Sequence, residues 1–427
     1  MGRRFLRSVL ISDILAFGIS MFFASTVVYG TAEFWSVPLE GGASIWPMIV
    51  MLVTGAAIGL GISVASWRAT APRPMYSRAV GFVTFSVVFT TVGLVLTRAY
   101  FSRSFLLTFG VAWLGLTLVH RSIRRQRPWQ ELLTVVTAEK VLVEDLHDVP
   151  HATVVAVLDP REESPGAPVE ASVTLAVDLR AVLSESMAQF VSSASMSGTR
   201  IRTFADVYEE HTGRLPMIHL AEGWELSEPV RRASYAPVKR VLDVILVGVT
   251  IIAWLPLALL VAVVVRMDSE GPILYRQERV GRDGRLFTLT KFRTMVDGAE
   301  AEGPQFTAHD DPRITRTGRF LRKSRLDELP QLWTVLRGEL SLIGPRPERP
   351  VFVEEFSKEI PFYEARHLIR PGVTGWAQVN YGYADDQAET IEKLTYDLFY
   401  IKHSSFWLDL HIVGKSIWTV LTGFGAR

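Results

Sequence analysis

Four long apolar runs fill the first third of the chain, and each is close to the length that a helix needs to cross a bilayer. They cover about residues 9–30, 46–67, 80–97 and 105–120. A cleaved signal peptide does not explain the first run, because no small-residue cleavage site leads into a soluble domain. The sequence therefore predicts a four-helix transmembrane region over residues 1–127.

The charges around these runs predict their orientation. Arginines gather before the first run, between the second and third, and after the fourth: Arg3, Arg4, Arg7, Arg68, Arg73, Arg78, Arg121, Arg124, Arg125 and Arg127. The segment between the first two runs has Glu33 and Glu40 and no basic residue. The positive-inside rule then places the N-terminus and everything after residue 127 in the cytoplasm. Arg98 and Arg103 weaken this signal without reversing it. Asp13 is close enough to the cytoplasmic end of the first run for its charge to reach the headgroups.

Composition excludes several kinds of site. The formal net charge is only +1, so the chain lacks the basic excess of a polyanion-binding protein, and no nucleic acid partner is expected. There is no cysteine. Disulfides, thiolate nucleophiles and cysteine-based zinc or iron–sulfur sites are therefore excluded.

Residues 128–237 have the composition of a small soluble domain. Short β-branched runs at 132–137, 153–158 and 173–177 alternate with helical stretches such as 179–192, which predicts an α/β fold. No glycine-rich turn follows the first strand, so this degenerate Rossmann-like domain is not expected to bind a dinucleotide. An interaction or spacer role is the expected one.

A fifth apolar run, 241–265, is long enough to span a bilayer. Basic residues flank both of its sides, among them Arg240 and Arg266, so both flanks are cytoplasmic by the same rule. Pro256 lies mid-run, where it favours a kink. The sequence predicts a re-entrant helix over 239–266 that breaks near Pro256, with a full crossing as the alternative.

The segment 275–381 is densest in chemical signals. Asp283-Gly284 is a favoured two-residue hairpin turn before a strand over 286–292. Lys291 and Arg293 share one face of that strand. Exposure of that face to solvent is enough to explain two cations there. Cations recur at i, i+3 and i+4 spacing further on, at Arg319, Arg322 and Lys323.

An Asp-Glu pair follows this cationic stripe. Apolar residues at helical spacing begin at Leu329, Pro330 suits the first turn, and Gly338 ends the run as a C′ glycine. Asp327 and Glu328 therefore lie at the N-terminus of a predicted helix. Helix capping by itself accounts for an aspartate in this place.

The cationic surroundings favour a catalytic hypothesis for the pair. A positive helix end and nearby arginines keep a carboxylate ionised and attract a diphosphate. An ionised aspartate beside a bound phosphate is a covalent nucleophile in aspartyl-phosphate enzymes, and this role is predicted for Asp327. Glu328 is predicted to hold Mg²⁺, which takes one or two carboxylates together with substrate phosphates.

Two arginine-bearing proline loops come next. Gly344-Pro345-Arg346-Pro347 fixes Arg346 on a stiff backbone suited to a bidentate phosphate contact. Arg370-Pro371-Gly372 opens a second loop with another arginine. Turn chemistry explains each loop separately. Together, after a carboxylate pair, they predict phosphate binding by Arg346 and Arg370.

Five motifs follow one another in a fixed order. They are Lys291-Phe292-Arg293-Thr294-Met295; Asp311, Arg313, Thr315, Gly318 and Leu321-Arg322-Lys323; Leu326-Asp327-Glu328-Leu329-Pro330-Gln331-Leu332; Gly344-Pro345-Arg346-Pro347; and Arg370-Pro371-Gly372-Val373-Thr374-Gly375-Trp376-Ala377-Gln378-Val379-Asn380. This set closely resembles the bacterial sugar transferases, the monotopic phosphoglycosyl transferases. The resemblance covers residues 238–427. The N-terminal part is similar to their large, exopolysaccharide-initiating branch.

The resemblance implies transfer of a sugar-1-phosphate from a UDP-sugar to polyprenyl (undecaprenyl) phosphate, releasing UMP and initiating exopolysaccharide, capsule or O-antigen synthesis. It implies that Asp327 is the nucleophile, forming a covalent aspartyl phosphosugar, and that Glu328 serves the magnesium ion. Further active-site and phosphate contacts are implied for Lys291, Arg322, Arg346 and Asp397. It also implies a re-entrant apolar helix.

Departures from the family pattern occur at Thr334, at Gly338-Glu339-Leu340-Ser341 and at Tyr381-Gly382, where the family usually has Gly-Arg. They leave the carboxylate pair intact and leave the sugar open. Two other functions stay open. One is a direct glycosyltransferase that releases UDP, although the chain has no Asp-x-Asp triplet of the kind that many such enzymes use to bind the diphosphate. The other is a non-catalytic membrane scaffold that binds anionic lipid.

The resulting prediction is a multi-pass protein of the bacterial inner membrane with its catalytic domain on the cytoplasmic face. It joins an α-helical bundle, an α/β middle domain and a mainly helical α+β catalytic domain with a re-entrant helix. The apolar spacing from Phe406 to Leu421 predicts a C-terminal helix, either interfacial or in the core. The lipid bilayer is an expected partner, and the prediction allows a homodimer.

Overall fold

The computed structural model describes residues 2–31, 33, 35, 44–65, 76–99, 102–126, 130–164, 172–220, 235–296, 298–299, 311–381 and 387–422. The chain divides into two compact units, Met1–Gln130 and Glu131–Arg427. Some charged residues used to predict the orientation lie outside the described residues or have side chains that do: Arg3, Arg4, Arg7, Glu40, Arg68, Arg73, Arg125 and Arg127. Gly382, at one of the departures from the family pattern, also lies outside the described residues.

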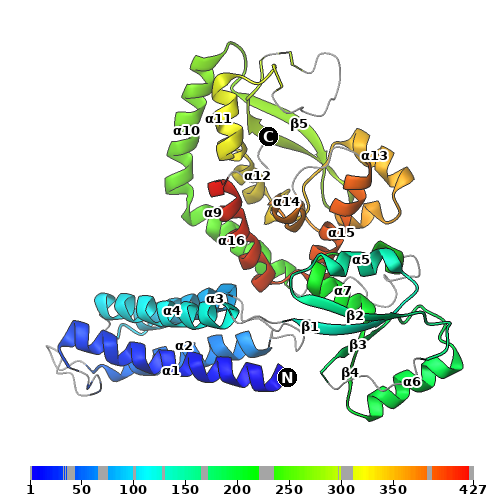
Figure 1. Ribbon diagram of the computed structural model, residues 1–427. Coiled ribbons are helices and arrows are strands. Elements are labelled where there is room, and N and C mark those ends of the chain that lie inside the picture. Colours follow the sequence, from blue (N-terminus) through cyan, green and yellow to red (C-terminus); the bar gives the residue numbers. More distant parts are fainter. Residues whose placement is uncertain are drawn as a thin grey trace. The chain divides into compact units, whose positions relative to one another are not determined.

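The described part of the first unit has four helices (Figure 1): α1 (Gly2–Tyr29), α2 (Trp46–Ala65), α3 (Tyr76–Leu96) and α4 (Arg103–Gln126). Helix α1 packs on α4, α2 on α3, and α3 on α4. Each helix is long and apolar enough to cross a membrane. Because exposed apolar side chains cover their outer faces, the unit suits a lipid environment, as the sequence predicts.

The position of Asp13 differs from the one predicted. Its carboxylate does not reach toward headgroups but is buried inside the bundle, where it accepts two hydrogen bonds of 2.7 and 2.9 Å from Arg121. The indole of Trp113 donates to the Asp13 carbonyl at 3.1 Å. A bidentate pair of this kind satisfies both charges where no water reaches them, so it fixes α1 against α4.

The glycines of the second helix form a packing face within the chain. A Cβ added to Gly55 would lie 3.0 Å from the Ser86 carbonyl oxygen, and one added to Gly59 would lie 3.0 Å from that of Phe82. Small residues allow α2 and α3 to approach closely. Because α3 occupies this face, it does not supply a dimer contact, and the homodimer stays a prediction.

The second unit begins with a four-stranded parallel sheet. Its elements are β1 (Glu131–Val136), α5 (Lys140–His147), β2 (Ala152–Leu158), β3 (Thr174–Val177), α6 (Glu185–Met196), β4 (Arg200–Thr203) and α7 (Phe204–Thr212), followed by η2 (Met217–Leu220). The strand order is β2-β1-β3-β4. The three predicted strands are present. Helix α6 starts later than predicted because the Ser184 hydroxyl accepts a hydrogen bond from the Met187 amide and caps it there.

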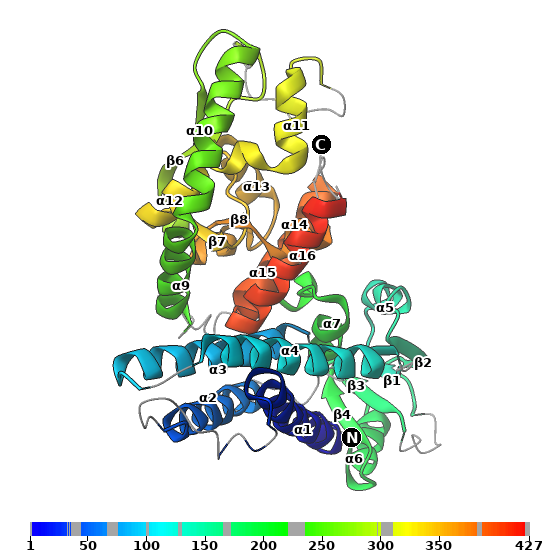
Figure 2. The ribbon, with the colours of Figure 1, turned by 90° about the vertical axis from the view of Figure 1, so that its left-hand side faces the viewer.

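The rest of the second unit is mainly helical (Figures 1 and 2). Its elements are α9 (Ala236–Val249), α10 (Ile251–Asp268), β5 (Leu274–Val280), η3 (Arg282–Gly284), β6 (Leu286–Phe292), α11 (Arg316–Ser324), η4 (Leu326–Glu328), α12 (Gln331–Arg337), β7 (Ser341–Ile343), α13 (Pro350–Glu359), η5 (Tyr363–Leu368), β8 (Gly372–Thr374), α14 (Trp376–Asn380), α15 (Gln387–His403) and α16 (Phe406–Thr422).

The fifth apolar run breaks at Thr250, not near Pro256 as predicted. Helix α9 ends and α10 begins at Thr250, while Pro256 lies inside α10. The Thr250 hydroxyl donates to the Leu246 carbonyl at 2.7 Å, and the Trp254 indole donates to the Val247 carbonyl at 3.1 Å. These side chains satisfy carbonyls at the interruption, which lets the helix break well before the proline. Helix α10 alone is also long and apolar enough to cross a membrane.

The C-terminal helix α16 packs in the core over part of its length, and the interfacial role predicted for it stays a prediction. Ile412 is fully buried in a cluster with Trp376 and Tyr400, so one part of the helix belongs to the core. Ile417 and Trp418 are exposed. Exposed apolar side chains of this kind suit a membrane interface.

Candidate active site

The hairpin that carries Lys291 forms as predicted. Strands β5 and β6 pair antiparallel, and the connection places Asp283 (φ 56°) and Gly284 (φ 74°) in the left-handed region. Two such residues in succession give the turn whose twist matches that of the strands. Lys291, near the end of β6, is thereby held beside the turn η4.

The Asp-Glu pair lies in η4, a short 3-10 turn that precedes α12. Arg325 (φ 58°) ends α11 in the left-handed conformation, and η4 follows at once. Pro330 is the residue before the first turn of α12, and no side chain caps that helix. The capping explanation for Asp327 is therefore wrong, because the capping position belongs to Pro330. Gly338 (φ 89°) ends α12, as predicted.

Glu328 is the anionic centre of a cationic cluster. One of its oxygens, Oε1, lies 3.4 Å from Lys291 Nζ, 3.4 Å from an Arg346 terminal nitrogen and 3.6 Å from an Arg325 terminal nitrogen. Burial raises the pKa of this carboxyl, but the three neighbouring cations outweigh burial and hold the pKa below its usual value. Glu328 is therefore ionised at neutral pH.

Asp327 has a different environment from its neighbour. Its side chain is buried, and no hydrogen-bond partner for its Oδ1 is found in the described part of the chain. Burial raises the pKa of Asp327, and so does the charge of Glu328, while Lys291 and Arg322 act in the opposite direction. Buried polar atoms are nearly always paired, so an orphan oxygen points to a missing ligand.

Arg322 lies between the hairpin and the pair. Its Nε donates to the Thr294 hydroxyl at 2.8 Å, and its charge is close enough to lower the pKa of Asp327. Helix α11, which carries Arg322, starts where the Thr315 hydroxyl accepts from the Gly318 amide. The stripe predicted from spacing is thus helical, and its last turn faces the carboxylates.

The two proline loops are joined by a two-stranded parallel sheet, β7 with β8. The Gly344 amide donates to the Thr374 carbonyl at 2.9 Å, and the Gly372 amide donates to the Pro345 carbonyl at 2.8 Å. A Cβ on Gly372 would lie 2.1 Å from the Gly344 nitrogen, so only glycine permits this approach. The pairing holds the backbone that leads into Arg346.

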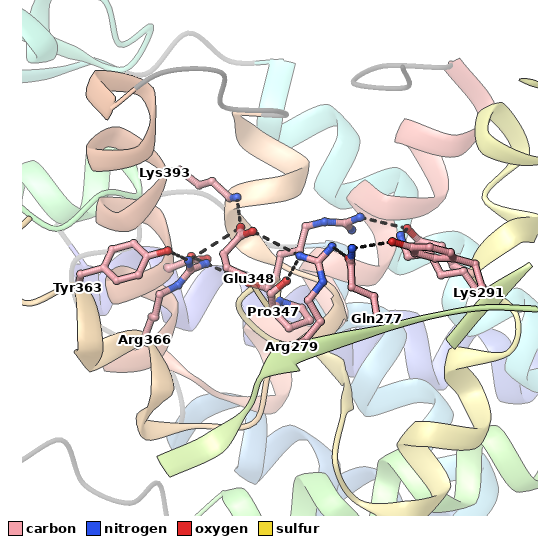
Figure 3. Close-up of polar contacts among 12 residues, drawn as sticks. Gln277, Arg279, Lys291, Pro347, Glu348, Tyr363, Arg366 and Lys393 are labelled. Carbon is pink, nitrogen blue, oxygen red and sulfur yellow. Dashed lines mark hydrogen bonds and ion pairs between the residues drawn. The ribbon is translucent and has the colours of Figure 1, made fainter. Parts of the chain in front are cut away.

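Behind Arg346 lies a network of charged side chains (Figure 3). Glu348 accepts from Lys393 at 2.9 Å and lies 3.6 Å from Arg279 and 3.9 Å from Arg366. Arg279 also donates to the Pro347 carbonyl at 3.0 Å. Burial raises the pKa of Glu348, but these cations together lower it to about 2. The loop is therefore fixed by charge as well as by backbone pairing.

Asp397 and Arg370 are not in the described contacts of the carboxylate pair. Asp397 is buried and accepts from Arg366 at 2.7 Å, and the same guanidinium donates to the Arg346 carbonyl at 3.1 Å. Asp397 is thus one residue removed from the Arg346 loop. Arg370 donates to the Gly338 carbonyl at 2.9 Å, beside the end of α12. The roles predicted for both residues stay predictions.

Comparison with known proteins places the chain in a family. The sequence profile described as bacterial sugar transferase matches residues 234–423. A UDP-glucose:undecaprenyl-phosphate glucose-1-phosphate transferase of Caulobacter vibrioides is 41% identical over 201 residues, which are 45% of this chain and 73% of that protein. The chain belongs to the bacterial sugar transferase family. The resemblance inferred from the five motifs is thus confirmed.

Other relatives extend the comparison. A UDP-N-acetylgalactosamine-undecaprenyl-phosphate N-acetylgalactosaminephosphotransferase of Aeromonas hydrophila is 44% identical over 239 residues, 56% of each chain. A putative undecaprenyl-phosphate N-acetylgalactosaminyl 1-phosphate transferase of Bacillus subtilis is 44% identical over 136 residues, 32% of this chain and 76% of that one. The chain covers about half, or less, of several of the longer relatives that it matches.

Sequence reasoning missed part of this site. Arg325 follows the cationic stripe, and its spacing of three residues from Glu328 is that of neighbouring side chains on a helix. Arg279, Glu348 and Arg366 were not singled out. Glu348 directly follows the Arg346 loop, and an acidic residue at that point is the signal that was available. Arg279 and Arg366 come close to Glu348 only in the folded chain.

Proposed function

We propose that this chain transfers a sugar-1-phosphate from a UDP-sugar to polyprenyl (undecaprenyl) phosphate, giving a polyprenyl-diphosphate sugar and UMP. The names of the relatives describe reactions of this type. The observation that carries the proposal is the buried Asp327, whose Oδ1 has no partner in the described residues, beside a Glu328 held by three cations. This step would initiate exopolysaccharide, capsule or O-antigen synthesis.

In the first half-reaction the ionised Asp327 carboxylate attacks the sugar-bearing phosphorus of the UDP-sugar. The new bond is an acyl phosphate, and the bond from phosphorus to the bridging oxygen breaks, so UMP leaves with that oxygen. Lys291, Arg322 and Arg346 surround the carboxylate pair. Their proposed role is to neutralise the charge of the diphosphate, the main contribution that a protein makes to phosphoryl transfer.

In the second half-reaction an oxygen of the polyprenyl phosphate attacks the same phosphorus. The acyl phosphate bond breaks and the Asp327 carboxylate is regenerated. Because UMP leaves before the polyprenyl phosphate reacts, the kinetics are ping-pong. Both steps take place at the same phosphorus and involve the same carboxylate. One set of cations therefore neutralises the phosphate charge in both.

The carboxylate oxygens of the Asp-Glu pair suit a magnesium ion that also binds the substrate. In the described residues no three His, Asp or Glu side chains are grouped to hold a metal. Mg²⁺ needs only one or two carboxylates when diphosphate and water supply its other ligands. Glu328 and the unpartnered Oδ1 of Asp327 are the oxygens that would hold it. When bound, the ion neutralises developing charge on the diphosphate.

Residues 131–427, apart from the membrane-embedded helices α9 and α10, are proposed to lie on the cytoplasmic face of the bacterial inner membrane. UDP-sugars are available there, and the arginine distribution favours this orientation. The break at Thr250, with exposed apolar side chains on both α9 and α10, supports a re-entrant helix that enters and leaves on the same side. Helices α1–α4 then anchor the chain by full crossings.

A nucleotide-release assay tests the proposal. The purified full-length chain is incubated with undecaprenyl phosphate, Mg²⁺ and, in turn, the UDP derivatives of glucose, galactose, N-acetylglucosamine and N-acetylgalactosamine. Release of UMP with at least one donor is expected. Release of UDP instead would show a direct glycosyltransferase, and release of neither from any donor would favour a non-catalytic scaffold.

A further inference from the structure

Helix α15 lies between the parallel-sheet domain and the Arg346 loop, and one of its faces is bound by the sheet domain. Arg214, two residues after α7, donates to Glu392 at 3.0 Å. The Leu215 amide donates to the Thr395 carbonyl at 3.1 Å. Both contacts are on the first half of α15, so the segment after α7 fixes the helix through a side chain and through its own backbone.

A second set of contacts fixes the end of the same helix. Glu209 of α7 accepts from Lys402 at 3.1 Å and from His403 at 2.6 Å. The Glu209 side chain is almost fully buried, with 5% of it exposed. A buried carboxylate with two partners makes a directional contact that does not slide. The sheet domain therefore holds α15 at two places along its length.

Arg214 is itself held firmly. Its guanidinium pairs with Asp145 of α5 at 3.0 Å as well as with Glu392. It also lies 5.9 Å from the ring centroids of Tyr208 and Tyr396, one from each side of the boundary. These charge and cation–π contacts fix a long side chain that would otherwise be mobile.

The neighbouring residues of α15 hold the Arg346 loop. Lys393, next to Glu392, binds Glu348 at 2.9 Å. Asp397, two residues after Thr395, binds Arg366, whose guanidinium donates to the Arg346 carbonyl. A helix is rigid over one or two turns, so a displacement of one face moves the other with it.

We infer that the parallel-sheet domain positions Arg346 through α15, and that Arg214 is the positioning residue at the boundary. This inference rests on the proposed role of Arg346 as a phosphate contact. It gives the sheet domain a task that its lack of a dinucleotide motif leaves unassigned. The domain need not bind a ligand to act, because a network of packed contacts is enough to couple two parts of a protein.

Hydrogen–deuterium exchange of the full-length protein tests the positioning by itself, without the reaction. Arg214→Met removes the charge and keeps the stem. The matched control is Thr137→Val, which removes a buried 3.0 Å hydrogen bond to Asp178 elsewhere in the same domain. Arg214→Met should speed exchange about tenfold in a peptide over 341–350, which contains the Gly344 amide bonded to Thr374. The control should leave it unchanged, and Arg214→Lys should restore part of the protection.

Two exchange results would overturn the inference: no change in that peptide in Arg214→Met, or an equal change in Thr137→Val. A double-variant experiment then asks whether Arg214 acts on activity through Arg346. Arg214→Met should lower kcat/KM for the UDP-sugar about tenfold in the native background and less than about twofold in Arg346→Lys. Equal losses in both backgrounds would contradict the inference. Absence of UMP release by the native protein would instead refute the proposed function, and exchange would still decide the positioning.

Discussion

Lys291 Nζ lies 3.4 Å from Glu328 Oε1, and this contact joins the β5–β6 hairpin to the turn that carries the carboxylate pair. Burial lowers the pKa of Lys291, while the charge of Glu328 raises it. The cations around Glu328 keep that residue ionised, and its charge in turn raises the pKa of Asp327. The two adjacent carboxylates therefore have distinct environments, which suits a nucleophile beside a charge-holding neighbour.

The first prediction concerns pH. Burial and the Glu328 charge raise the pKa of Asp327 above its usual value. Only the ionised carboxylate attacks phosphorus, so the rate should rise with pH as Asp327 loses its proton. The acid limb of kcat/KM, which reports the free enzyme, should therefore have its midpoint above the ordinary pKa of an aspartate. A limb near pH 4, the ordinary value for an aspartate, would contradict the environment described for Asp327.

The second prediction concerns Glu348→Gln. This change leaves Lys393, Arg366 and Arg279 without their shared anion and should destabilise the chain by about 3 kcal/mol, or roughly 5 °C in Tm. The folded-state pKa of Glu348 is depressed to about 2, so its contribution is present at neutral pH. It should be lost as the pH falls below the usual value of about 4.5 toward 2.

Thermal unfolding in detergent at pH 7 checks this second prediction. Glu354→Gln is the matched control, because Glu354 and its partner Lys358 are exposed on α13. The control should not change Tm. Equal values of Tm for the native protein and Glu348→Gln would show that the network does not stabilise the loop.

The third prediction concerns the junction of the two proline loops. Gly372→Ala places a Cβ 2.1 Å from the Gly344 nitrogen and should separate β7 from β8. Gly414→Ala in α16 meets nothing within 4 Å. We expect the first variant to lose about 3 kcal/mol of stability and most UMP release, and the second to keep both. Native activity in Gly372→Ala would contradict the close approach.

The fourth prediction concerns topology, and the absence of cysteine makes it simple to measure. Lys358→Cys should be protected from a membrane-impermeant thiol reagent in intact cells, since a re-entrant α9–α10 keeps the exposed helix α13 inside. Trp35→Cys, in the first connection, should be labelled. Pro256→Ala should not alter the pattern, because the break lies at Thr250. Labelling of Lys358→Cys from outside would mean that α10 crosses the bilayer.

Much of the fold was predictable, because apolar run length and turn chemistry act locally. The four helices α1–α4, the Asp283-Gly284 turn and the Gly338 terminus each follow from a few adjacent residues. The break at Thr250 was not predictable from Pro256, because it depends on the Thr250 hydroxyl and the Trp254 indole finding carbonyls. That choice is a property of the folded chain.

The site was predictable where its residues occur in motifs and not where distant segments meet. Lys291, Glu328 and Arg346 are brought together as expected. Arg370 contacts the Gly338 carbonyl, although the sequence presents it as a second Arg346. Arg279, Arg366 and Lys393 reach Glu348 from three separate elements, so no sequence spacing could have indicated them.

The formation of a covalent intermediate on Asp327 is the central claim, and it is measured most directly by trapping. The native chain is incubated with Mg²⁺ and a UDP-sugar labelled in the sugar, without polyprenyl phosphate, then denatured and analysed by peptide mass spectrometry. The account predicts one phosphosugar on Asp327, its discharge on addition of polyprenyl phosphate, and no adduct in Asp327→Asn. Normal labelling and turnover in Asp327→Asn would contradict it.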